Sequence, residues 1–166
     1  MPHRPSFAEF AELARGATLV PVYRRLLNDT LTPVTAFCKI QEEDWSFLFE
    51  SVVGGEKVGR YSFLGSGPFL TFQAFGNRIV WQDRTKRRTV EEEHRDPMAL
   101  LAERLSAYRV PHLPGMPRFL GGAVGFLGYD TVRYAENLPN APPDDRSLPD
   151  MAFAFHDRMV VFDLRP

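Results

Sequence analysis

The sequence has few features that would indicate a disulfide, a metal or a membrane. Cys38 is its single cysteine, so no disulfide and no multi-cysteine metal site can form within the chain. No apolar run reaches about 18 residues, the length typical of a membrane-spanning helix, and the N-terminus has no hydrophobic signal segment. The formal net charge of −1 gives no electrostatic reason to expect binding to nucleic acid or an anionic membrane. These absences predict a cytoplasmic protein with no nucleic-acid or membrane partner.

The motifs of common catalytic centres are also missing. The four histidines are scattered, without the spacing of metal-ligand pairs, and no G-x-S-x-G segment surrounds a serine. The glycines at positions 121, 122, 125 and 128 lack the order of a nucleotide-binding loop and do not open a helix. We expect these glycines to let another backbone or a ring approach a strand closely. By its chemistry alone the chain contains no catalytic residue, no cofactor site and no metal site.

Two helices are predicted from capping signals. Ser6 and Glu9 form a capping box before the apolar positions of a first helix, which Gly16 is placed to end. Asp96 caps a second helix with Pro97 at its first position, and this helix stops before Pro111.

Most of the remaining chain has strand character. Residues 33–40 alternate between apolar and other side chains with period two, which predicts a half-buried strand, and Gly76-Asn77 is typical of a two-residue hairpin turn. Strands are predicted at 18–23, 33–40, 47–49, 61–64, 69–75, 78–82, 86–93, 119–130, 151–155 and 159–164. Because no alternating βαβ rhythm is present, we expect an α+β domain: a largely antiparallel sheet or sandwich with two or more flanking helices.

The segment from Leu48 to Gly65 carries the most informative polar groups. Glu50 and Ser51 end an apolar run, a glycine-rich turn follows, and Arg60 enters a second apolar run. A carboxylate, a hydroxyl and a guanidinium on two joined strands suit a ligand that has both an ammonium and a carboxylate group. The alternative is an ordinary ion pair between Glu50 and Arg60 across a hairpin, with Ser51 capping a turn.

The sequence LFES, followed by GRYSFLG, resembles the N-terminal domain of the large component (component I) of anthranilate synthase, a chorismate-utilising enzyme. Three further segments agree in the same order along the chain: PVYRRLLNDTLTPVTAFCKI, FLGGAVGFLGYD and LPDMAFAF. Together these segments cover nearly the whole sequence. The piece from Asp29 to Pro33 is similar to the anthranilate synthase branch in particular. The resemblance implies that residues 1–166 form the N-terminal regulatory part of the chorismate-utilising enzyme fold.

The resemblance also implies a function for the parent protein. Enzymes of this family convert chorismate, with glutamine or ammonia, to anthranilate in tryptophan biosynthesis, and they are lyases under feedback inhibition by tryptophan. The chorismate site, its Mg²⁺ ligands and the catalytic histidine belong to a C-terminal catalytic domain whose motifs do not occur in this chain. The chain ends at Pro166 directly after a strand-like run, as a cut would leave it. We therefore expect this chain alone to be inactive, and its partners to be L-tryptophan, a glutamine amidotransferase subunit and its own C-terminal domain.

The family resemblance assigns an inhibitor site rather than a catalytic one. Glu50 and Ser51 match the family's Glu-Ser pair at the tryptophan site, and Arg60 falls near a basic position there. Two other hypotheses stay open. The chain could be the corresponding domain of aminodeoxychorismate synthase, where a bound tryptophan is structural, or a stand-alone amino-acid-binding module. The length of the natural open reading frame and the residues encoded after Pro166 would separate the three.

Overall fold

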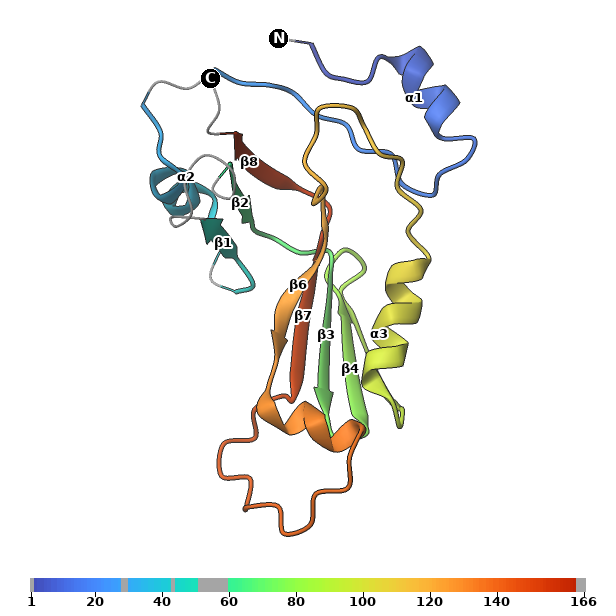
Figure 1. Ribbon diagram of the computed structural model, residues 1–166, viewed down its shortest axis with the longest axis vertical. Helices are drawn as coiled ribbons and strands as arrows, with labels where there is room; N and C mark the ends of the chain where they lie inside the picture. The colour runs from blue at the N-terminus through green and yellow to red at the C-terminus, as the bar shows by residue number, and fades with distance from the viewer. Residues whose placement is uncertain (1, 28–29, 43, 51–59, 164–166) are drawn as a thin grey trace.

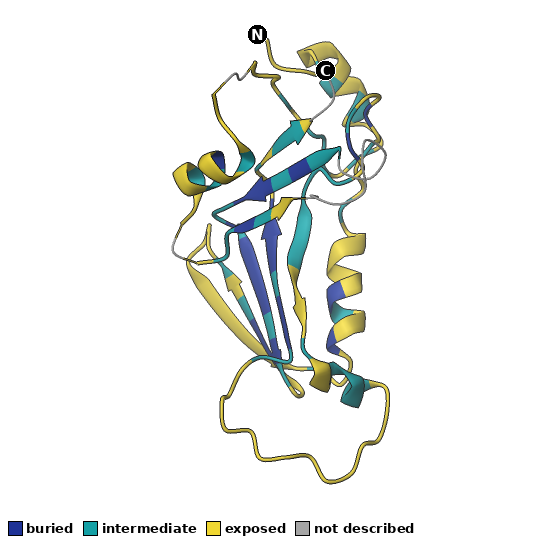
Figure 2. Cartoon of the chain, turned by 60° about the vertical axis from the view of Figure 1, so that its left-hand side comes forward, coloured by how far each residue is buried: buried dark blue, intermediate teal, exposed yellow. Residues whose placement is uncertain are grey.

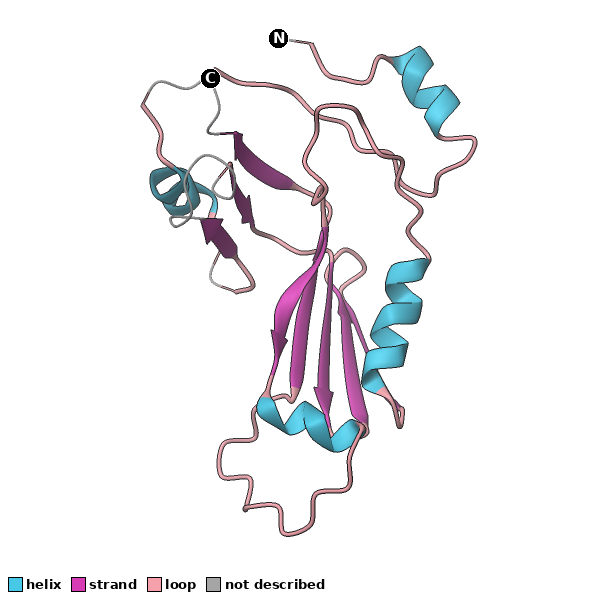
Figure 3. Ribbon diagram, in the orientation of Figure 1, coloured by secondary structure: helices cyan, strands magenta, loops and turns pink. Residues whose placement is uncertain are grey.

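The computed structural model describes residues 2–27, 30–42, 44–50 and 60–163 (Figure 1). Its strands form two antiparallel sheets, one of three strands in the order β1-β2-β8 and one of five in the order β5-β4-β3-β7-β6. The strands are β1 (Phe47–Glu50), β2 (Tyr61–Gly65), β3 (Leu70–Phe75), β4 (Arg78–Asp83), β5 (Arg88–Glu93), β6 (Gly122–Leu127), β7 (Met151–His156) and β8 (Met159–Asp163). The helices are α1 (Phe7–Leu13), α2 (Pro33–Ile40), α3 (Pro97–Ser106) and the 3-10 helix η2 (Tyr129–Tyr134). Two antiparallel sheets with few helices (Figure 3) confirm the predicted α+β class.

Helix α3 covers one face of the five-stranded sheet (Figure 1). Asp96 accepts a hydrogen bond from the Ala99 N–H (2.9 Å) and Pro97 occupies the first turn, so this helix begins where its capping signal predicted. Leu101 packs with buried side chains of the sheet to form the core: Leu70, Phe72, Ala74, Ile79, Met151 and Phe155. The central strands are buried while the outer face of α3 is exposed (Figure 2). None of the helices in the described ranges has the length and apolar character needed to cross a membrane.

The hairpin and capping-box predictions were correct. Gly76 has φ +58° between β3 and β4, a left-handed conformation that glycine adopts without steric cost. At the N-terminus, Ser6 and Glu9 form the predicted capping box, with the Ser6 N–H donating to a Glu9 carboxylate oxygen at 2.7 Å.

Residues 33–40 form helix α2, so the strand predicted there was wrong. The Thr32 N–H donates to Thr35 Oγ1 (2.8 Å) and the Thr35 N–H donates to Thr32 Oγ1 (3.2 Å), which satisfies two N–H groups of the first turn. Pro33, with its fixed φ, stands at the first helical position. Ala36 and Ile40 are four residues apart and therefore share a helix face as readily as a strand face. The helix packs against β1 and β2.

The strand predicted at 18–23 was also wrong. In the described part of the chain this segment contributes one isolated bridge, in which Tyr23 pairs with Arg4. Thr18 instead binds the segment after α3: its Oγ1 donates to the Ala107 carbonyl (2.8 Å) and accepts from the Arg109 N–H (2.7 Å). Thr18 therefore bonds to the segment after α3 and not, as the β-forming residues of 18–23 had predicted, to a neighbouring strand.

Aromatic side chains join the three-stranded sheet to the five-stranded one. The Phe47 ring, from β1, lies 4.9 Å from the His156 ring at the end of β7 and 6.3 Å from Phe119. Phe63, from β2, lies 5.4 Å from the same Phe119 ring. His156 is only 3% exposed, and burial lowers the pKa of its imidazole because the charged form loses hydration. This cluster therefore holds a neutral histidine at the junction of the sheets.

The buried histidine predicts acid sensitivity. In the unfolded chain the His156 imidazole takes up a proton below about pH 6.5, whereas the folded chain keeps it neutral to lower pH. The free energy of unfolding should therefore fall as pH drops from 7.5 to about 5, measured by urea unfolding. His156→Gln should flatten this dependence, while the exposed His112, changed in the same way, should leave it intact. If the free energy of unfolding depended on pH equally steeply in both variants, His156 would not be the source of the acid sensitivity.

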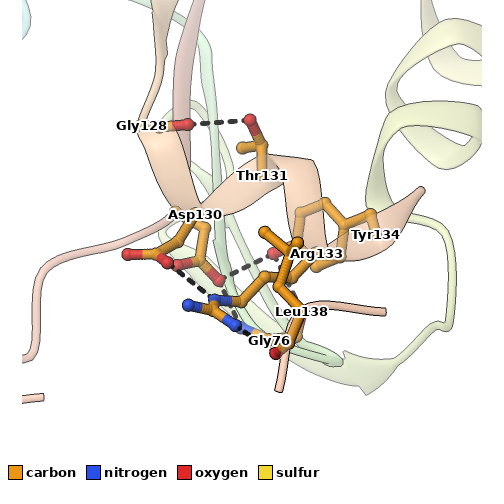
Figure 4. Close-up of polar contacts among 8 residues, drawn as sticks. Gly76, Gly128, Asp130, Thr131, Arg133, Tyr134 and Leu138 are labelled. Atoms are coloured by element: carbon orange, nitrogen blue, oxygen red, sulfur yellow. Dashed lines mark hydrogen bonds and ion pairs between the residues drawn. The ribbon is translucent and has the colours of Figure 1, made fainter. Parts of the chain in front are cut away.

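Tyr134 and Asp150 form a hydrogen-bonded pair at the end of the five-stranded sheet that lies away from the three-stranded one (Figure 4). The Tyr134 hydroxyl donates to Asp150 Oδ2 (2.8 Å), and the Gly76 N–H donates to the same oxygen (2.7 Å). Burial and this carboxylate raise the pKa of Tyr134 well above its usual range. Arg133 pairs with Asp130 (2.7 Å) and donates to the Leu138 carbonyl (2.8 Å). Helix η2, the β3–β4 turn and the start of β7 are thus held together.

Candidate inhibitor site on the three-stranded sheet

The predicted site residues lie on the three-stranded sheet. Glu50 is the last residue of β1 and is exposed, and Arg60 directly precedes β2. Because β1 and β2 pair antiparallel, both residues lie at the same end of this sheet. Ser51 lies outside the described residues. The structure therefore places Glu50 and Arg60 near the same sheet end and leaves the role of Ser51 a prediction.

Arg60 has a partner that sequence reasoning did not find. Its Nε and Nη2 each donate to an Asp163 carboxylate oxygen at 2.8 Å, and its guanidinium lies 4.5 Å from the centre of the Tyr61 ring. These bonds raise the pKa of the guanidinium further, so it stays charged. The alternative ion pair between Glu50 and Arg60 is wrong in this structure, since the ion pair of Arg60 is with Asp163. Any anionic group that approaches Arg60 shares it with that carboxylate.

Ser62 is a polar residue of this sheet that the sequence analysis missed. It stands directly opposite Glu50 in the pairing of β1 with β2, and directly opposed residues in an antiparallel pair point to the same face. The Ser62 side chain is fully buried, and its Oγ has no hydrogen-bond partner among the described residues. Buried hydroxyls are normally hydrogen-bonded, so an unpaired one beside the Glu50 position is unusual. The signal in the sequence was a serine between aromatic residues of a strand.

The unpaired hydroxyl predicts a stabilising substitution. Ser62→Ala should raise the free energy of unfolding by about 1 kcal/mol, since it removes a buried polar group that has lost its hydration and has no hydrogen-bond partner among the residues that the structure describes. Ser66→Ala is the matched control. The Ser66 hydroxyl accepts from the Glu42 N–H and binds Ser46 Oγ, both at 3.0 Å, so its loss should destabilise the chain. Urea unfolding of both variants tests this, and a loss of stability in Ser62→Ala would contradict it.

A groove lies elsewhere, between the β4–β5 hairpin and α3. Its volume is about 440 Å³, and Trp81, Val90 and Leu100 line it together with charged side chains of both signs. The Trp81 Nε1–H donates to Glu92 (2.7 Å), and the Arg104 guanidinium lies 5.9 Å from the centre of the Trp81 ring. The groove contains none of the predicted site residues.

Within the described ranges no cluster of three His, Cys, Asp or Glu side chains could hold a metal ion.

Comparison with known proteins gives one consistent result. No protein-family model matches the chain. Anthranilate synthase component 1 of Acetivibrio thermocellus is 38% identical over 160 residues, which cover 96% of this chain and 32% of that protein. Anthranilate synthase alpha subunit 2, chloroplastic, of Arabidopsis thaliana is 40% identical over 169 residues, which cover 95% of this chain and 27% of that protein.

A solved structure agrees with these relatives. The crystal structure of anthranilate synthase component I from Streptococcus pneumoniae TIGR4 superimposes with a TM-score of 0.51 at 25% sequence identity, and the match covers 86% of this chain and 29% of that one. The chain thus spans roughly a third of the length of the proteins it matches.

Proposed function

The chain belongs to the anthranilate synthase component I family over the third of those proteins that it spans, and from this premise we propose that it is the N-terminal, tryptophan-sensing part of such an enzyme. In this proposal the parent protein converts chorismate, with glutamine or ammonia, to anthranilate. The observation that supports it most is the similarity over nearly the whole chain to proteins named for this activity in bacteria and plants. The aminodeoxychorismate synthase and stand-alone module hypotheses stay open as alternatives.

The proposed role of this part is to bind L-tryptophan, the inhibitor, through Glu50, Ser51 and Arg60. The Glu50 carboxylate is exposed at the end of its strand and can accept hydrogen bonds from the amino acid's ammonium group. Arg60 supplies a fixed positive charge near this sheet end, although the Nε–Nη2 edge of its guanidinium already donates to Asp163.

Other parts of the proposal lie outside this chain. The part of the parent protein that this chain does not span would contain the catalytic residues and would bind chorismate and the Mg²⁺ ion. A glutamine amidotransferase subunit would supply ammonia. The C-terminal catalytic domain and the cytoplasmic location stay predictions.

One assay tests the proposed function. The parent protein should form anthranilate from chorismate and ammonia, detected by anthranilate fluorescence, and tryptophan should inhibit it. The 166-residue chain alone should show no turnover above a control without protein, since its sequence lacks the motifs of a catalytic centre. A parent that converts chorismate to another product, or an active isolated chain, would refute the proposal.

A further inference from the structure

The two edges of the five-stranded sheet differ sharply in chemistry. The edge strand β5 carries Arg88 and three consecutive glutamates, Glu91 to Glu93. Charged side chains are a common protection of a sheet edge against pairing with another strand. The other edge strand, β6, reads Gly-Ala-Val-Gly-Phe-Leu and has no charged residue and no proline. The fold therefore protects one edge and leaves the other suited to strand pairing.

The backbone groups at the outer edge of β6 can be identified from the register. The Gly128 N–H donates to the Asp150 carbonyl at 2.7 Å, in line with the pairing of β6 and β7. Bonded and non-bonded pairs alternate along an antiparallel ladder. Ala123, Gly125 and Leu127 therefore turn their N–H and C=O groups away from β7. Among the residues that the structure describes, no strand pairs with this side of β6.

Apolar side chains continue the unprotected edge. Phe126 is 51% exposed and Leu127 is 49% exposed, and Tyr129, at the start of η2, is 87% exposed. Large apolar side chains gathered at one edge are typical of a surface that another element covers. A partner that fits must therefore provide an extended backbone for pairing and apolar side chains for packing.

We propose that a β-strand from the part of the parent protein that this chain does not span pairs with the outer edge of β6 and covers its apolar side chains. The inference rests on the proposed function, because it requires the longer parent. The matched relatives are about three times as long as this chain, so such a strand would belong to the same polypeptide. A tethered strand has an effective concentration of order millimolar, which favours it over a second copy of the chain.

Amide hydrogen exchange tests the inference residue by residue. In the isolated chain the N–H groups of Ala123, Gly125 and Leu127 should exchange rapidly. In the parent they should exchange at least about 100-fold more slowly, because each now donates to the added strand. The internal control is the outer edge of β5. The His94 N–H donates to the Asn77 carbonyl, and bonded and non-bonded residues alternate from there along β5. The Thr89 N–H therefore faces away from β4. The Thr89 amide should exchange rapidly in both proteins.

A matched pair of proline variants adds a second measurement. Ala123→Pro and Thr89→Pro each remove an outward N–H, which edge strands tolerate, so both isolated chains should keep their unfolding midpoints within a few degrees. In the parent, Ala123→Pro should speed exchange at Gly125 and Leu127 by about ten-fold or more, while Thr89→Pro should leave those amides protected.

Two results would overturn the inference. The first is equal, rapid exchange at the β6 edge in the isolated chain and in a parent that forms anthranilate, a result that leaves the proposed function intact. The second is protection that grows with the concentration of the isolated chain and is no greater in the parent, which would assign the edge to a second copy. A protected edge in a parent that forms no anthranilate would support the inference and refute the proposed function alone.

Discussion

Glu50→Ala in the parent protein is expected to raise the tryptophan concentration for half-inhibition by about ten-fold or more while turnover without inhibitor stays nearly unchanged. A hydrogen bond to a charged group contributes about 1.5–3 kcal/mol, and 1.4 kcal/mol corresponds to ten-fold in affinity. Glu50 is exposed at a strand end and packs into no core, so its removal should not disturb the fold. The measurement is the inhibition curve of anthranilate formation, supported by calorimetric tryptophan binding.

Glu103→Ala provides the control for this result, because Glu103 is an exposed glutamate on α3, the helix that packs against the five-stranded sheet. It should leave both turnover and inhibition as they are. If Glu50→Ala abolished turnover but left the inhibition of any remaining activity unaltered, Glu50 would not belong to the effector site.

The second large effect concerns the close approach of β6 to β7. Gly125→Ala should destabilise the isolated chain by about 3 kcal/mol, which lowers the thermal midpoint of a chain of this length by about 6–12 °C. An added Cβ would lie 2.7 Å from Phe153 Cα and would collide with the Ala152 carbonyl oxygen. Both atoms belong to the backbone of a buried strand, so neither can move aside as a flexible side chain would.

Gly16→Ala is the matched substitution, because nothing lies within 4 Å of a Cβ added there. It should leave the midpoint unchanged or raise it slightly, since alanine restricts the unfolded chain. Calorimetric scans of the two variants measure the difference, and similar midpoints would show that β6 can move away from β7 without loss.

Local signals predicted the fold wherever a turn or cap had a specific mechanism. The turn at Gly76, the cap at Asp96 and the capping box at Ser6 were all found in the structure, because each depends on a few neighbouring residues. Residues 33–40 were predicted wrongly because apolar residues two apart suit a strand and residues four apart suit a helix. The cap formed by Thr32 and Thr35 decides between the two, and it has a threonine where the usual box has a glutamate or glutamine.

The candidate site could be predicted only in part. The position of Glu50 and Arg60 at one end of a strand pair followed from the two apolar runs and the glycines between them. The bond from Arg60 to Asp163 could not, since the two residues are far apart in sequence and meet only when β8 joins β2. The burial of the Ser62 side chain likewise depends on what surrounds it in three dimensions.

The hydrogen bond between Tyr134 and Asp150 has a consequence for the exposed loop that separates them (Figure 4). Because the two side chains are hydrogen-bonded at 2.8 Å, the two ends of the loop are held together by the fold and not by the loop's own sequence. The entropic cost of closing a loop depends only weakly on its length, and doubling the number of residues costs about 0.6 kcal/mol. Insertions and deletions between η2 and β7 should therefore be tolerated more readily than in the turn at Gly76, whose backbone N–H and carbonyl both bind this pair.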